Sequence, residues 1–141
     1  MNHMPAISLP MTVLLTAAEP ELLGALHREL PLLDARNLGP ELPTALPDGP
    51  LYCFVDWLLP EESGLEMIRR LRESEPTRAS HITMVLEAPD ADDKRHALRA
   101  GADDYLLGPL DAAKLVQRLG TYAGQFHALR PPLGRACNTA S

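Results

Sequence analysis

One short segment limits the possible folds of this chain more than any other. Residues 51–55, LYCFV, are apolar or aromatic throughout and lead directly into Asp56. A run this short and this apolar is typical of a central strand buried on both faces of a parallel sheet. Ser63, with Glu66 three residues later, matches the capping box that starts a helix. The segment therefore predicts a strand, a loop and a helix. It places Asp56 at the carboxyl end of the strand, where open α/β sheets bind ligands.

The rest of the chain alternates between short apolar runs and segments with helical periodicity. Further strands are predicted at residues 11–15, 32–35, 82–86 and 104–107. Further helices are predicted at residues 20–30, from Asp90 to Ala100, and from Asp111 to about Leu129. This alternation predicts an α/β fold, in which a single doubly wound domain contains a five-stranded parallel sheet with helices on both faces.

The segment between Leu38 and Pro50 departs from this pattern. It contains prolines at positions 40, 43, 47 and 50. An interior proline costs a helix about 3 kcal/mol, because it has no N–H group and its ring clashes with the preceding turn. We therefore expect irregular backbone or one helical turn, so that the second helix of the fold is short or absent.

Composition excludes several classes of protein. At 141 residues the chain suits one domain, expected at residues 11–130 between flexible tails at 1–10 and 131–141. The net charge of −6 argues against a nucleic-acid-binding surface. No apolar run approaches the roughly 18 residues of a membrane span, and no signal peptide is evident. The two cysteines form no disulfide framework, and the five histidines lack metal-ligand spacing. A cytoplasmic protein is expected.

Two motifs together resemble a known family. Asp56, a proline four residues later, a glycine eight residues later and the sequence GLEMIRRLR resemble the phospho-acceptor segment of bacterial two-component receiver domains. GADDYL at residues 101–106, followed by Pro109, looks like the fifth strand of the same family. The resemblance covers roughly residues 11–129. It implies a CheY-like, flavodoxin-type strand order of 2-1-3-4-5 and a cis peptide bond before Pro109.

The resemblance also implies a catalytic set that this chain lacks. Receivers hold Mg²⁺ with two acids after the first strand, and they place a hydroxyl after the fourth strand and a lysine after the fifth. The metal and the lysine neutralise the phosphoryl oxygens in the transition state. Here the acids are replaced by Ala17 and Ala18, the hydroxyl by Leu86 and the lysine by Gly108. Only Asp56 remains. We expect Mg²⁺ binding to be lost, with no other cofactor and no catalytic residue.

Several neighbouring residues leave alternatives open. Glu19 and Glu87 lie just beyond the lost groups and either compensate for them or stay solvated at the rim. Asp56 is either a residual acceptor or an inert acid that accepts hydrogen bonds from loop amides. Tyr105 corresponds to the aromatic residue that switches position in active receivers, and with Leu86 in place of the hydroxyl it is expected to be fixed. Trp57 is expected over or beside the crevice, either occluding it or anchoring a partner.

A second candidate site is a charged face contributed by the last two predicted helices and the last predicted strand. Its residues are Lys94, Arg95, Asp103, Asp104, Lys114 and Arg118. In receivers of winged-helix transcription regulators, charges in this arrangement pair across a symmetric dimer, and a self-complementary patch is what a twofold interface needs. The chain is therefore expected to dimerise through this face without phosphorylation. The alternative is a solvated charged surface, since exposed ion pairs contribute only about 0–1 kcal/mol each.

These observations favour an atypical receiver domain in two-component phosphorelay signalling. It is expected to act as a phosphorylation-independent interaction and dimerisation module, with a histidine kinase, an output domain or another signalling protein as partner. One alternative is a working phospho-receiver that accepts phosphate on Asp56 from a histidine kinase. Another is a small-molecule sensor that uses the vacated acidic pocket. An enzyme is not expected, because no nucleophile–base pair or phosphate-binding loop is evident.

Overall fold

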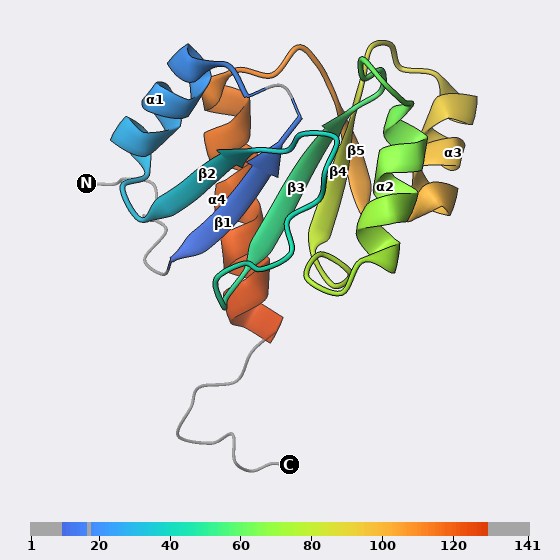
Figure 1. Cartoon of the computed structure of the whole chain (residues 1–141). Helices are drawn as coiled ribbons and strands as arrows, with labels where there is room; N and C mark the ends of the chain where they lie inside the picture. Colours follow the sequence, from blue (N-terminus) through green and yellow to red (C-terminus); the bar gives the residue numbers. More distant parts are fainter. Residues whose placement is uncertain (1–9, 17, 130–141) are drawn as a thin grey trace.

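The computed structural model describes residues 10–16 and 18–129, with side chains up to Ala123. The expected tails at 1–10 and 131–141 therefore lie, except for Pro10, outside the described residues, as does Ala17. Nine elements alternate along the described chain, and they form one sheet with helices against it (Figure 1).

The sheet has five parallel strands in the order β2-β1-β3-β4-β5. The strands are β1 (Met11–Leu15), β2 (Leu33–Asn37), β3 (Leu51–Asp56), β4 (His81–Leu86) and β5 (Asp104–Leu107). The fold expected from the sequence, including the strand order, is confirmed. Because all strands run the same way, their carboxyl ends meet at one edge of the sheet, and β3 brings Asp56 to that edge.

Four helices accompany the strands, with α1, α2 and α3 between strands and α4 after β5, in agreement with the expected loss of one helix. They are α1 (Pro20–Glu29), α2 (Gly64–Glu73), α3 (Ala91–Ala100) and α4 (Ala112–Leu129). The expected caps form: Ser63 Oγ accepts a hydrogen bond from Glu66 N at 3.1 Å, and Asp111 Oδ1 accepts one from Lys114 N at 2.8 Å. No helix in the described part of the chain is long and apolar enough to cross a membrane.

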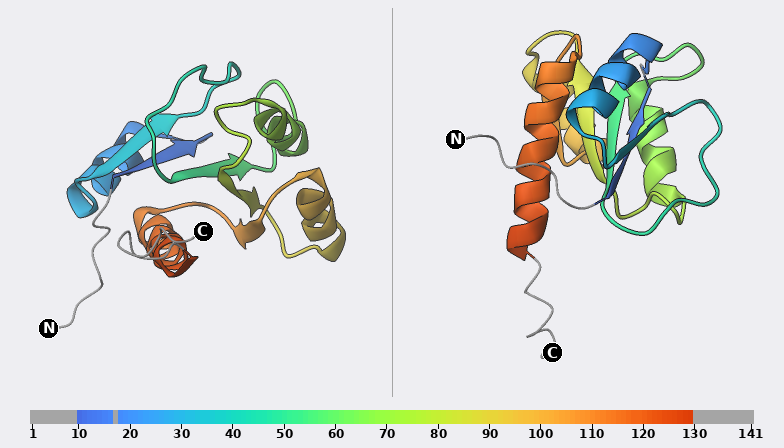
Figure 2. Two further views of the ribbon diagram at one scale, coloured as in Figure 1. Left: turned by 90° about the horizontal axis from the view of Figure 1, so that it is seen from below. Right: turned by 90° about the vertical axis from the view of Figure 1, so that its left-hand side faces the viewer.

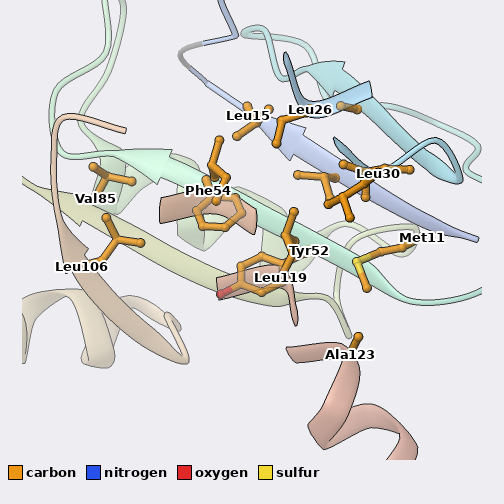
Figure 3. Close-up of a cluster of buried hydrophobic side chains, with 14 residues drawn as sticks. Met11, Leu15, Leu26, Leu30, Tyr52, Phe54, Val85, Leu106, Leu119 and Ala123 are labelled. Carbon is orange, nitrogen blue, oxygen red and sulfur yellow. The ribbon is translucent and has the colours of Figure 1, made fainter. Parts of the chain in front are cut away.

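Two apolar clusters fill the space on either side of the sheet. Helices α1 and α4 cover one face, and α2 and α3 cover the other (Figure 2). Figure 3 shows the cluster under α1 and α4, to which Tyr52 and Phe54 of β3 contribute together with Leu26 and Leu119. The alternate β3 residues, including Val55, belong to the cluster under α2 and α3. Strand β3 is thus buried on both faces, which explains its continuous apolar run.

Strand β2 differs from the prediction at both ends. It covers Leu33–Asn37 rather than residues 32–35. Every residue of β1 pairs with one of β2, from Met11 with Leu33 to Leu15 with Asn37. The ladder therefore continues through exposed polar residues at the edge of the sheet, where backbone pairing does not require an apolar sequence.

The connection from Leu38 to Pro50 is irregular along its described backbone and forms no helix, which is one of the two outcomes expected for this proline-rich segment. It is nevertheless attached to the domain. Leu38 is buried and its N–H donates to Leu15 O at 2.8 Å. At the other end, Pro50 O accepts a hydrogen bond from Thr12 N at 3.0 Å. In the middle, Arg70 of α2 donates to Pro40 O at 2.7 Å.

Candidate functional site

Asp56 is held at the end of β3 by a close approach of the following loop. Gly64 N donates to Trp57 O at 2.8 Å, which brings the start of α2 back against the strand. A Cβ atom on Gly64 would lie 2.1 Å from Asp56 O, so a side chain cannot be placed there without moving the backbone. Trp57 N also donates to Val85 O at 3.0 Å. Gly64, eight residues after Asp56, is therefore required by the geometry of residues 57–63, which we call the acceptor loop.

Thr16 is bonded to both the backbone and the side chain of Asp56. Its Oγ1 donates to Asp56 Oδ2 at 2.9 Å and accepts a hydrogen bond from Asp56 N at 2.9 Å. Among the residues that the structure describes, the partner of the carboxylate is thus a hydroxyl group directly after β1 rather than the loop amides expected for an inert acid. Our sequence analysis missed Thr16, although its position after an apolar strand, at the edge where Asp56 also ends, was an available signal.

Asp56 lies in an environment that disfavours its charged form. Burial raises the pKa of its carboxyl group, the hydrogen bond from Thr16 partly offsets this effect, and the negative charge of Glu87 raises the pKa further. The site therefore acts on Asp56 mainly through desolvation, which the Thr16 hydrogen bond opposes and to which the repulsion from Glu87 adds a smaller contribution. In a receiver that binds Mg²⁺, a cation would act in the opposite direction.

A groove of about 350 Å³ runs alongside Asp56. It is lined by Asp56, Trp57, Leu58, Val85, Leu86, Glu87, Gly108 and Pro109. The peptide bond between Gly108 and Pro109 is cis, as the resemblance implies. A Cβ atom on Gly108 would lie 2.9 Å from Val85 Cγ1, so a lysine at this position would require Val85 to shift.

The other positions of the lost catalytic set lie in apolar surroundings or outside the description. Leu86 is only 1% exposed and belongs to the cluster under α2 and α3. Ala18 packs against the cluster under α1 and α4. Ala17 lies outside the described residues. Of the two acids that were candidates for compensation, Glu87 is exposed and lines the groove, whereas Glu19 is exposed at the start of α1.

These residues do not fit a Mg²⁺ ion. Magnesium requires near-octahedral oxygen ligands, usually from more than one carboxylate. Asp56 has only Glu87 as an acidic companion in the lining of the groove. Within the described residues, no three His, Cys, Asp or Glu side chains are grouped so that they could hold a metal ion.

The aromatic residues near the groove pack against the protein. Trp57 is half-buried against the cluster under α2 and α3 and lines the groove, while Leu58 beside it is 63% exposed. Tyr105 packs against the same cluster, and Lys94 Nζ lies 5.0 Å from the centroid of its ring. This cation–π contact covers Tyr105 from the side of α3.

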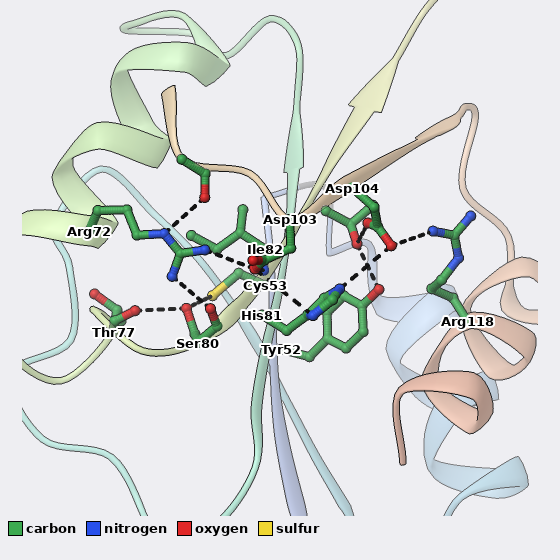
Figure 4. Close-up of polar contacts among 12 residues, drawn as sticks. Tyr52, Cys53, Arg72, Thr77, Ser80, His81, Ile82, Asp103, Asp104 and Arg118 are labelled. Carbon is green, nitrogen blue, oxygen red and sulfur yellow. Dashed lines mark hydrogen bonds and ion pairs between the residues drawn. The ribbon is translucent and has the colours of Figure 1, made fainter. Parts of the chain in front are cut away.

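The acidic residues of the charged face have partners within the chain (Figure 4). Asp104 Oδ2 accepts a hydrogen bond from Arg118 Nη1 at 2.9 Å. Asp103 Oδ2 accepts one from Arg72 Nη2 at 2.8 Å and another from Ile82 N at 2.8 Å. These acids therefore join β5 to α4 and to α2.

Two further cations of this face also have intramolecular contacts. Lys114 Nζ donates to Leu107 O at 3.1 Å and to Pro109 O at 2.9 Å. Arg95 pairs with Asp92 one turn earlier in α3. With the contact between Lys94 and Tyr105, each of the six charged residues of the face has a partner inside the chain, so pairing across a dimer would have to exchange existing contacts.

A polar network at the amino ends of β3, β4 and β5 was not foreseen from the sequence. Tyr52 Oη lies 2.6 Å from Thr83 Oγ1, which donates to Asp104 Oδ1 at 2.5 Å (Figure 4). His81 Nε2 lies 3.5 Å from Asp104 Oδ2. Burial alone would raise the pKa of Asp104, but the hydrogen bonds from His81 and Thr83 and the charge of Arg118 together lower it. The network stabilises the ionised carboxylate.

The comparisons with known proteins agree with this geometry. The family model described as response regulator receiver domain matches residues 45–120, more than half of the chain. The phosphate regulon transcriptional regulatory protein PhoB of Pseudomonas aeruginosa is 40% identical over 70 residues, which are 50% of this chain and 31% of the relative. The transcriptional regulatory protein TrcR of Mycobacterium tuberculosis is 36% identical over 129 residues, which are 86% of this chain and 49% of the relative. The chain thus spans half the length, or less, of these curated relatives.

Solved structures give the same result. A putative response regulator from Chloroflexus aurantiacus superposes with a TM-score of 0.58 at 25% identity, covering 82% of this chain and 98% of that one. A two-component response regulator from Clostridium difficile superposes with a TM-score of 0.62, covering 83% and 98%; at 14% identity it shows the fold alone. Together with the family model, which matches both the Asp56 segment and the segment around Tyr105, these similarities show that the chain belongs to the response regulator receiver domain family.

Proposed function

We propose that this receiver domain signals without phosphorylation of Asp56 and acts as a protein-interaction module. The observation that carries the proposal is the electrostatic environment of Asp56. Its carboxylate is bonded to the neutral Thr16 hydroxyl and repelled by Glu87. No lysine or arginine is among the described residues that line the groove.

Phosphoryl transfer to a carboxylate needs positive charge at the reacting oxygens, which a metal ion and a lysine supply in receivers. At Asp56 the transferred group would add negative charge beside Glu87, in a partly desolvated groove. The proposal follows from this charge balance, and it includes the absence of a catalytic role and of a Mg²⁺ cofactor.

Intact-mass spectrometry after incubation with acetyl phosphate and Mg²⁺ tests the proposal. We expect no mass gain for the wild-type chain or for Asp56→Asn. A variant that carries Ala17→Asp, Ala18→Asp and Gly108→Lys restores the acids and the lysine, and a mass gain in this variant alone would show that these lost groups account for the missing reaction. A stoichiometric adduct on the wild type that Asp56→Asn removes would refute the proposal. It would support the alternative of a phospho-receiver served by a histidine kinase.

We further propose that the interaction surface is the face formed by α3, β5 and α4. Its charged residues already have partners within the chain, so the side chains that a partner protein could still bury are apolar. Leu98 of α3 is 46% exposed and Leu107 of β5 is 43% exposed. A twofold contact over this face would bury both side chains while keeping the intramolecular ion pairs.

Analytical ultracentrifugation can test the apolar face as a dimer interface. We expect the wild type to self-associate without a phosphodonor and the double variant Leu98→Glu, Leu107→Glu to be monomeric. Leu58→Glu is the matched control, since Leu58 is also exposed but lies on the acceptor loop. A wild-type monomer at high micromolar concentration would refute the dimer.

The partner class follows from the relatives. PhoB and TrcR are named as transcriptional regulatory proteins, and the chain matches half or less of each. We propose that an output domain or a protein of this signalling class is the partner of the α3–β5–α4 face, and that the domain works in the cytoplasm.

A further inference from the structure

A second hollow lies across the acceptor loop from the Asp56 groove. Its volume is about 190 Å³. It opens between the segment 37–40, which follows β2, and the segment 59–62 of the acceptor loop. Thr16 and Met67 complete its lining. Pro60 and Met67 also belong to the family motif around Asp56, but neither the lost catalytic positions nor the proposed interaction face includes this hollow.

The walls of the hollow are fixed by hydrogen bonds in the structure. Arg70 of α2 donates to Pro40 O at 2.7 Å on one wall and to the Glu62 carboxylate at 2.8 and 3.2 Å on the other. Within the wall formed by residues 59–62, Leu59 N donates to Glu62 O at 3.2 Å, which further fixes the conformation of this segment. Because one guanidinium joins both walls, the hollow exists without a ligand and binding would require little reorganisation.

The lining indicates the kind of ligand that would fit. Most of its side chains are apolar: Leu38, Pro40, Leu59, Pro60 and Met67. The charged groups are Glu61 and Glu62, of which Glu62 is neutralised by Arg70. Glu61 is exposed and has no ion pair among the described residues. A positively charged group on a small apolar body therefore complements the hollow. The volume is below the roughly 300–1,000 Å³ of sites for drug-sized ligands, so the ligand must be small.

Thr16 connects the hollow to Asp56. Its side chain lines the hollow, and the same hydroxyl donates to Asp56 Oδ2 and accepts from Asp56 N. A ligand that turns this hydroxyl would change the hydrogen bonding of the carboxylate. Since the bond from Thr16 lowers the pKa of Asp56, its loss would raise that pKa.

We propose that this hollow is an effector site for a small organic ammonium ion, and that Thr16 transmits its occupancy to Asp56. Such a site would give the domain an input that does not require phosphate. The inference does not depend on whether Asp56 can be phosphorylated, because the hollow and the Thr16 hydrogen bonds are separate from the lost catalytic positions.

The experiment is a titration of the full chain with benzylamine, monitored by amide and side-chain carboxyl NMR. Benzyl alcohol and benzoate, which have the same ring without the positive charge, are the controls. We expect saturable shifts of the amides at 37–40 and 59–62 with a dissociation constant of about 1 mM, as for a fragment of this size, accompanied by a shift of the Asp56 carboxyl signal. No saturable shift, equal shifts from benzoate, or shifts confined to the Asp56 groove would each overturn the proposal.

Variants separate binding from transmission. A Cβ atom on Gly39 meets nothing within 4 Å, so Gly39→Met should fill the hollow without a clash and abolish the benzylamine shifts. Gly120→Met, at a helical glycine with equally open space, should leave them unchanged. Thr16→Val should retain the shifts at 59–62 but lose the response of Asp56. If Thr16→Val leaves the Asp56 response intact, the hydroxyl does not transmit occupancy and the proposal fails.

Discussion

The two ends of the central strands hold their carboxylates in opposite ways. At the amino ends, Asp104 and Asp103 are each bonded to an arginine and to further donors. At the carboxyl ends, Asp56 has the Thr16 hydroxyl as its bonded partner and Glu87 as a repelling neighbour. The pKa of Asp104 is lowered, and that of Asp56 is raised.

This difference indicates which end stabilises the fold and which is available for chemistry. A carboxylate whose folded pKa is lowered stabilises the native state when it is ionised, whereas one whose folded pKa is raised destabilises it. The amino end therefore contributes stability near neutral pH. The carboxyl end, where receivers carry out phosphoryl transfer, holds a half-buried charge, and no lysine or arginine is among the described residues that line its groove.

The largest expected effect on stability comes from removing Arg72, which joins α2 to the residues that precede β4 and β5 at the amino ends of these strands. Its guanidinium donates to Asp103 Oδ2 and to the backbone oxygens of Gly101, Arg78 and Ser80. Arg72→Ala should lower the free energy of unfolding by about 3 kcal/mol, because several partly buried acceptors lose a charged donor together. Urea unfolding measures the loss.

Arg69→Ala is the matched control for this prediction. Arg69 lies in the same helix, 53% exposed, and pairs with Glu66 one turn earlier. Its removal should cost no more than about 0.5 kcal/mol. Equal effects of the two variants would show that the amino-end network does not stabilise the domain more than a surface ion pair does.

The second effect concerns Asp104. Asp104→Asn should destabilise the protein by about 2 kcal/mol at pH 7, because Arg118 loses its ionised partner. The direction in which this stabilisation changes with pH follows from the lowered pKa of Asp104. The contribution is complete above the unfolded value of about 4 and is lost as pH falls through the folded value. The difference between wild type and variant should therefore shrink in urea unfolding below about pH 4. A difference that is constant with pH would contradict this assignment.

The smallest effect on the free energy of unfolding is expected at Asp56, where the substitution should stabilise the protein rather than destabilise it. Asp56→Asn should stabilise the protein by about 0.5 kcal/mol at pH 7, since it removes a partly desolvated charge next to Glu87. Because the folded pKa is raised, the penalty is present above that value and is relieved as pH falls through it. The gain should thus disappear in acid. Thermal unfolding of both proteins at pH 7 and at about pH 3, below the unfolded value of about 3.9, tests this, and a destabilised variant at pH 7 would show that the ionised Asp56 is well compensated.

Local sequence signals were sufficient for most of the fold. Each of these signals acts over a few residues, so its effect can be predicted from the sequence. They are the apolar runs of β1, β3, β4 and β5, the caps at Ser63 and Asp111, and the prolines after Leu38. The extension of β2 to Asn37 could not be predicted in this way, because it depends on the length of its partner strand β1.

The polar contacts depend on the register between strands and helices that are distant in sequence. Thr16 meets Asp56 only because β1 and β3 pair in a register that sets Leu15 beside Phe54, and Asp104 meets Thr83 only through the pairing of β4 with β5. The sequence identified the charges of the α3–β5–α4 face but not their partners. Arg118 was expected to pair with another copy of the chain, and in the structure it lies 2.9 Å from Asp104 of the same chain.

The central claim is that Asp56 is an acid without a cationic partner in the described part of the chain. A pH titration of the Asp56 side-chain carboxyl ¹³C signal, with and without millimolar Mg²⁺, tests it most directly. We predict a midpoint above the ordinary aspartate value of about 3.9 that Mg²⁺ leaves unchanged, and a higher midpoint in Thr16→Val, which loses the hydrogen bond that lowers the pKa. A midpoint that falls saturably with Mg²⁺, or that already lies below the ordinary value without it, would contradict the claim.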